Sequence, residues 1–103
     1  MTAVDTAIIN NYGDGIAVRA SSSVTLINCT ISGNYDAGIA ASAGQINITN
    51  TVISDNQGLG ALYMYGTAQV TITDSEIFGN EGFGLYVAEA SAWVEFRGEV
   101  SIH

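Results

Sequence analysis

Few residues of this 103-residue chain have side chains that could carry out chemistry. There is one histidine, His103, one cysteine, Cys29, and no lysine. A cysteine or multi-histidine metal site and Schiff-base or P-loop chemistry require residues that this composition lacks. A Ser–His–Asp triad is not expected within one chain, because the one histidine is the last residue. We therefore expect no metal and no cofactor. The remaining candidates are carboxylates, asparagine amides and tyrosine rings.

The composition also limits the partners. The chain has 10 Asp and Glu against 2 Lys and Arg, a net charge of −8, while 48% of its residues are hydrophobic. The length and the hydrophobic share predict one folded domain over residues 1–103. The negative charge argues against nucleic acid and anionic membrane surfaces as partners. No signal peptide is visible at the N-terminus, so the localisation stays open, with a surface or secreted location expected for an excised fragment.

An internal repeat is the strongest pattern in the sequence. Four segments align without gaps (7–18, 30–41, 52–63 and 76–87), and each has isoleucine second, asparagine fifth and glycine ninth. The asparagines recur at intervals of 23, 22 and 24 residues and are Asn11, Asn34, Asn56 and Asn80. Alternating apolar and polar residues at 24–28, 46–50 and 70–74 predict a strand before each of the last three units. Residues 93–98 begin a fifth copy.

A unit of about 23 residues with short strands, Asn and Gly turns and no helical period predicts one coil of a solenoid. Residues 28–40 (NCTISGNYDAGIA) and 75–87 (SEIFGNEGFGLYV) resemble the repeats of bacterial β-helix surface proteins and of the pectate-lyase-like superfamily. Together with the chain-crossover rule, the resemblance implies right-handedness. The predicted fold is an all-β, right-handed, single-stranded parallel β-helix of about four and a half coils of 22–24 residues.

Each repeated column has a predicted role. The isoleucines and the alternate strand residues should point inward and stack like on like. We expect the four asparagines to form a structural ladder, bonded amide to amide, that satisfies turn amides. A column of Asp, Asn and Gly six residues earlier predicts a second row of turns, and the repeated glycine predicts a positive φ or a tight turn. Cys29 is interpreted as a small, partly buried apolar residue.

Two outward surfaces suggest functions other than structural support. At outward positions of the third strand, Ala17, Ala40, Leu62 and Tyr86 indicate either a one-residue register shift in copy three or an exposed apolar patch. Tyr63, Tyr65 and Tyr86 form a candidate contact surface, and the resemblance implies that such rings stack on the sugars of a polysaccharide. A threonine face is the basis of a lesser alternative, an ice-binding solenoid. Only Thr71 and Thr73 fit its strict T-x-T pattern.

The resemblance also implies lyases with Ca²⁺-binding carboxylates and glycosidases with paired acids. In the predicted rows, Asp14, Asp36, Asp55 and Glu76 have no second acid, and Asp5 and Asp74 lie about 14 Å apart. We find no catalytic residues and predict a non-enzymatic structural or interaction module. Its open ends expose unpaired strand edges without an evident cap. The expected partner is a second copy in an end-to-end homo-oligomer, or flanking coils of a longer chain.

Overall fold

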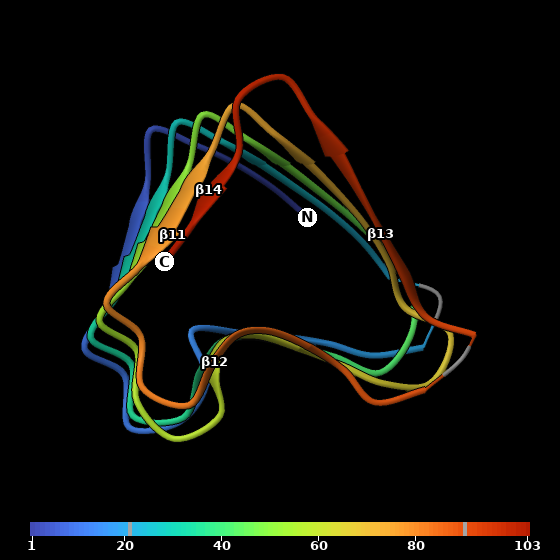
Figure 1. Ribbon diagram of the computed structural model, residues 1–103, viewed down its shortest axis with the longest axis horizontal. Helices are drawn as coiled ribbons and strands as arrows, with labels where there is room; N and C mark the ends of the chain where they lie inside the picture. Colours follow the sequence, from blue (N-terminus) through green and yellow to red (C-terminus); the bar gives the residue numbers. More distant parts are fainter. Residues whose placement is uncertain (21, 90) are drawn as a thin grey trace.

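The chain winds into a stack of three-sided coils (Figure 1). The computed structural model describes residues 1–20, 22–89 and 91–103. Its strands form three parallel sheets, one on each side of the coil, and each strand pairs with the equivalent strand one coil away. The predicted all-β solenoid is confirmed. No helix in the described ranges is long and apolar enough to cross a membrane.

In the described ranges, sheets A and B have five strands each, and sheet C has four. Sheet A contains β1 (Thr2–Val4), β4 (Ser23–Ile27), β7 (Gln45–Thr49), β10 (Gln69–Thr73) and β13 (Trp93–Arg97). Sheet B contains β2 (Ala7–Ile9), β5 (Thr30–Ser32), β8 (Val52–Ser54), β11 (Glu76–Phe78) and β14 (Ser101–Ile102). Sheet C contains β3 (Ile16–Val18), β6 (Ala37–Ala41), β9 (Gly60–Met64) and β12 (Phe83–Val87). The stack thus has four complete coils and two-thirds of a fifth.

The turn from sheet A to sheet B is the same in every coil. It places one residue in the left-handed region, with φ of 47° to 66°, and these residues are Asp5, Asn28, Asn50, Asp74 and Gly98. Asparagine, aspartate and glycine tolerate this region best, because short polar side chains or a missing Cβ reduce the steric cost. The predicted row of turns is confirmed, and it fixes the constant length of this part of the coil.

The core consists of aliphatic rows that run along the stack. Leu26, Ile48 and Ile72 stack inside sheet A, and Ile31, Ile53 and Ile77 stack inside sheet B, all with no exposed surface. The sequence predicted these inward positions correctly. The last coil differs, because Phe96 is 48% exposed where no further strand of the described residues covers it.

Coil three contains the one-residue register shift. Gly60 pairs with Ala37 and with Phe83, so the strand β9 is displaced by one residue from the gapless alignment. Leu62 therefore aligns with Ile39 and is fully buried rather than outward. In this pairing Ala61 occupies the row of Gly38 and Gly84, and Gly60 lies one residue before that row. Gly60 has a positive φ of 96°, as predicted for the repeated glycine. A one-residue shift exchanges the inward and outward faces of a strand, and here it keeps the core filled.

Candidate functional site

The four asparagines lie in one file at the turn from sheet B to sheet C. The Nδ2 group of Asn11 donates to Oδ1 of Asn34 at 2.8 Å, and the same bond recurs in the next two coils at 2.8 and 2.9 Å. The backbone N–H of Asn11, Asn34 and Asn56 donates to the same oxygens at 3.1, 3.1 and 2.9 Å. From Asn34 onward, the second amide hydrogen binds a carbonyl of the preceding coil, such as Ile31 O at 3.2 Å from Asn56. In the buried coils every amide group is therefore occupied.

The asparagine ladder explains why two of the repeated positions are glycine. A Cβ atom built on Gly15 would lie 2.8 Å from Nδ2 of Asn34, and one on Gly38 would lie 2.9 Å from Nδ2 of Asn56. Each would also lie within 2.8 Å of a backbone carbonyl oxygen of the next coil. Neither glycine has a positive φ. The tight approach, rather than left-handed backbone, explains these glycines.

A second ladder of small polar side chains follows the turn between sheets A and B. The Oγ1 of Thr51 accepts from the backbone N–H of Cys29 at 3.3 Å and donates to Thr49 O at 2.9 Å. One coil later, Oγ of Ser75 accepts from the N–H of Thr51 at 3.1 Å. Cys29 is more deeply buried than the partly buried residue that was predicted, and its thiol lies 3.3 Å from Ala3 O. Sequence reasoning missed Thr51 and Ser75, although both directly follow the repeated turn residue.

An aromatic cluster lies on the outer face of sheet C. The rings of Tyr63 and Tyr86 stack in parallel, with centroids 5.1 Å apart and an interplanar angle of 1°. Tyr65 packs on Tyr63 at 5.5 Å, and Phe83 packs on Tyr86 at 4.8 Å. The structure thus brings the three tyrosines of the candidate contact surface together. It adds Phe83, which is half exposed and which the sequence did not single out.

Two of the acidic side chains, Asp14 and Asp74, cap turns. Oδ1 of Asp14 accepts from the N–H of Ala37 at 2.9 Å, and Oδ1 of Asp74 accepts from the N–H of Glu99 at 3.0 Å. Glu95 and Arg97 form an exposed ion pair on β13. Among the described residues, no group of three or more His, Cys, Asp or Glu side chains is placed to hold a metal ion.

The outward rows of sheet A follow the predicted register. Thr2, Thr25, Asn47, Thr71 and Glu95 face the same way in successive strands. The next outward row contains Val4, Ile27, Thr49, Thr73 and Arg97. Only β10 has two threonines in these two rows, so the face is mixed rather than a threonine array.

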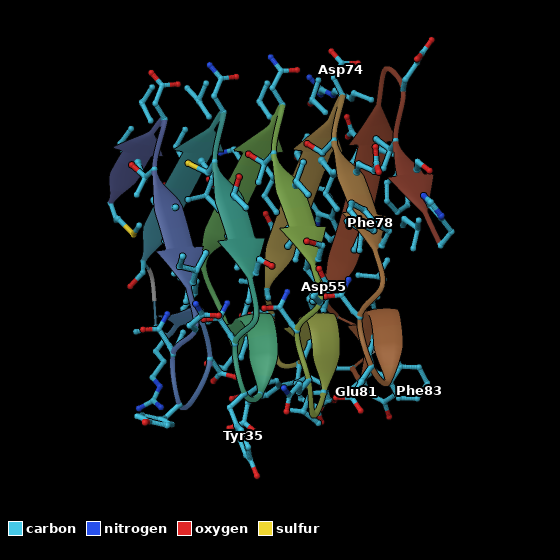
Figure 2. The ribbon with its side chains drawn as sticks, turned by 90° about the vertical axis from the view of Figure 1, so that its left-hand side faces the viewer. Tyr35, Asp55, Asp74, Phe78, Glu81 and Phe83 are labelled. Atoms are coloured by element: carbon cyan, nitrogen blue, oxygen red, sulfur yellow. The ribbon has the colours of Figure 1, made fainter. Side chains whose placement is uncertain are left out.

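The C-terminal end of the stack exposes side chains that interior coils bury. Phe96 and Ile102 are 48% and 40% exposed, whereas their equivalents one coil earlier, Ile72 and Ile77, have no exposed surface. Phe96, Gly98, Val100 and Ile102 line a hollow at this end. Figure 2 shows the stack from the side, with Glu81 and Phe83 projecting near the same end.

The comparison with family models assigns the fold. A model described as a right-handed β-helix region matches residues 1–100. The chain belongs to the right-handed β-helix family. The match covers the four complete coils and the fifth as far as residue 100, and it agrees with the handedness that the resemblance implied. Comparisons with curated proteins and with solved structures found no match. The family assignment fixes the architecture of this β-helix.

Proposed function

We propose that this β-helix is a non-catalytic structural and interaction module that self-associates through the open ends of its stack. The apolar C-terminal end carries the proposal. Half-exposed Phe96 and Ile102 continue rows that are otherwise fully buried. Covering them would remove apolar surface from water, which favours association by about 25 cal/mol for each Å².

The strand edges support the same proposal. At one end β1 and β2 are the first strands of sheets A and B, and at the other end β13 and β14 are the last. Head-to-tail stacking would continue both sheets in parallel, β13 on β1 and β14 on β2 of the second copy. A head-to-head dimer would instead place like strands against each other. Head-to-tail contacts that do not close into a ring extend into filaments.

Light scattering after size-exclusion chromatography, over a range of protein concentrations, tests this function. We expect the mass of the native chain to rise with concentration and the variant Phe96→Asp to stay monomeric. Tyr35→Asp is the matched control, because Tyr35 is exposed in a turn of coil two, away from both ends. A native chain that stays monomeric at high concentration would overturn the proposal.

The aromatic cluster favours a second candidate, carbohydrate binding. Stacked and tilted rings at 4.8 to 5.5 Å present a continuous aromatic surface of the kind that packs against sugar rings. A glycan array tests it, with binding expected to disappear in Tyr63→Ala and Tyr65→Ala and to persist in Tyr35→Ala. Loss of binding in all three variants, or no binding by the native chain, contradicts this candidate.

A further inference from the structure

The turn from sheet B to sheet C forms an exposed edge on the side of the stack, which we call the B–C corner. It consists of the residues that follow the ladder asparagines, 12–14, 35–37, 57–59 and 81–83. Tyr35 is 61% exposed and Leu59 is 42% exposed, although both belong to coils that have a further coil on each side. The exposure of this corner therefore comes from its place on the side of the stack. Figure 2 shows Tyr35, Glu81 and Phe83 projecting from the same edge.

The residues of the B–C corner lie in rows along the stack, as the strand residues do. Tyr35 and Glu81 each directly follow a ladder asparagine, in coils two and four. The N–H of Tyr35 donates to Asn11 O, and the N–H of Glu81 donates to Asn56 O, both at 2.9 Å and both in the preceding coil. Tyr35 and Glu81 therefore share one row. Two coil spacings separate them, which is about 9.6 Å along the stack.

Coils two and four each combine an aromatic ring with an acid at this corner. Coil two has Tyr35 and Asp36, and coil four has Glu81 and Phe83, all of them exposed. An aromatic face binds a guanidinium group through a cation–π contact, and a carboxylate binds it through an ion pair. Arginine suits both contacts better than lysine, because its guanidinium group is planar. The corner thus has two pairs of side chains suited to arginine.

The charge of the chain favours a basic occupant over a second copy. The net charge is −8, and the chain has no lysine and only two arginines, Arg19 and Arg97. Among the described residues the one ion pair joins Arg97 to Glu95, so the carboxylates of Asp36 and Glu81 have none. Two such chains repel each other, and anionic ligands are repelled as well. A basic segment of another polypeptide would complement both the charge and the rings.

We propose that the B–C corner is a docking surface for a basic polyproline II segment that has arginines three residues apart. Polyproline II has three residues per turn and rises about 3.1 Å per residue, so residues i and i+3 lie on one face about 9.3 Å apart. This distance matches the two coil spacings between Tyr35 and Glu81. A β-strand does not match it, because residues on one face of a strand recur about every 6.6 Å. Proline-rich segments also dock readily on exposed aromatic rings.

The proposed arrangement uses coils two to four. One arginine stacks on Tyr35 and pairs with Asp36, and the other pairs with Glu81 and stacks on Phe83. The two spacer residues lie over coil three, where Leu59 is exposed. This surface goes beyond the proposed function, because it lies on the side of the stack and shares only Phe83 with the aromatic cluster of sheet C.

An NMR titration of the ¹⁵N-labelled full chain measures both the affinity and the position of binding. The probe is the peptide Pro-Pro-Arg-Pro-Pro-Arg-Pro-Pro. Its matched control is Pro-Pro-Arg-Arg-Pro-Pro-Pro-Pro, which has the same composition and charge but adjacent arginines. We expect the probe to shift the amide signals of Tyr35, Asp36 and Glu81. It should bind at least about threefold more tightly than the control, because adjacent arginines reach only one of the two pairs.

Substitutions in the protein separate the corner from the overall charge. Tyr35→Ala and Glu81→Gln should each weaken binding of the probe about two- to fivefold, as expected for an exposed cation–π contact or ion pair. Glu76→Gln is the matched control for Glu81→Gln, because it removes an exposed carboxylate of the same coil at the start of β11, outside the corner. It should change the affinity less than about 1.5-fold, since salt screens the more distant charge.

Equal affinity for the probe and its adjacent-arginine control, or no shift at the corner, would overturn the docking surface. Equal losses for Glu81→Gln and Glu76→Gln would do the same, because binding would then report only the net charge. Shifts centred on Tyr63 and Tyr65 would place the peptide on the aromatic cluster and refute the corner as its site. Corner shifts that grow with protein concentration alone would identify a second copy as the occupant and refute a basic partner. Failure of self-association leaves this test unchanged, because the corner lies on the side of the stack.

Discussion

Replacing Asn56 by alanine should weaken the stack at its centre. Oδ1 of Asn56 accepts from the backbone N–H and the amide of Asn34, and Nδ2 donates to Asn80 Oδ1 and Ile31 O. The side chain has no exposed surface. Its loss leaves two donors of Asn34 and the carbonyl of Ile31 without their partners. At about 1–3 kcal/mol for each unsatisfied buried group, and with some relief from entering water, we expect the free energy of unfolding to fall by about 3–5 kcal/mol.

Asn11→Ala is the matched control at the end of the same ladder. Asn11 is exposed, and its side chain contributes only the donation to Asn34 Oδ1. The backbone N–H of residue 11 keeps its bond to the same oxygen. Removing one hydrogen bond near solvent should cost about 0.5–1.5 kcal/mol.

Urea unfolding followed by circular dichroism, at one low protein concentration, compares the two variants. For a chain of this size each kcal/mol lowers Tm by about 4–8 °C, so Asn56→Ala should melt at least about 12 °C below the native chain. Thermal and urea transitions should rank the variants in the same order. Equal losses for Asn56→Ala and Asn11→Ala, within about 0.5 kcal/mol, would show that burial of the ladder does not govern its strength.

Three further predictions concern other interior positions. Gly38→Ala should lower the free energy of unfolding by about 1–3 kcal/mol, because the added Cβ would lie 2.9 Å from Nδ2 of Asn56, whereas Gly13→Ala meets nothing within 4 Å and should be neutral in the same urea titration. Thr51→Val removes a buried hydroxyl that both accepts and donates and should cost about 1–3 kcal/mol, while Thr51→Ser should cost less; equal melting temperatures would argue against the second ladder. The Cys29 thiol, 2% exposed, should react with a disulfide reagent only as the chain unfolds, and rapid labelling of the native chain would contradict its burial.

The repeat made much of the fold predictable. Aliphatic residues alternate along each strand, and turn residues recur at a constant distance from them, so one coil implies the next. The same periodicity placed Asn34 and Asn56 in one file. The exposure of side chains in the last coil could not be predicted from the repeat, because it depends on whether a neighbouring strand is present.

The amino-acid sequence by itself determined the period, the strands, the inward rows and the asparagine positions, since these depend on local residue type and spacing. The tertiary structure alone decided the register of coil three, where one residue more in the turn moves Leu62 into the core and stacks Tyr63 on Tyr86. The physical reason is that the pairing between coils decides which side chains of a strand point into the core. That pairing depends on contacts between side chains more than 20 residues apart, and these contacts form only when the chain is wound.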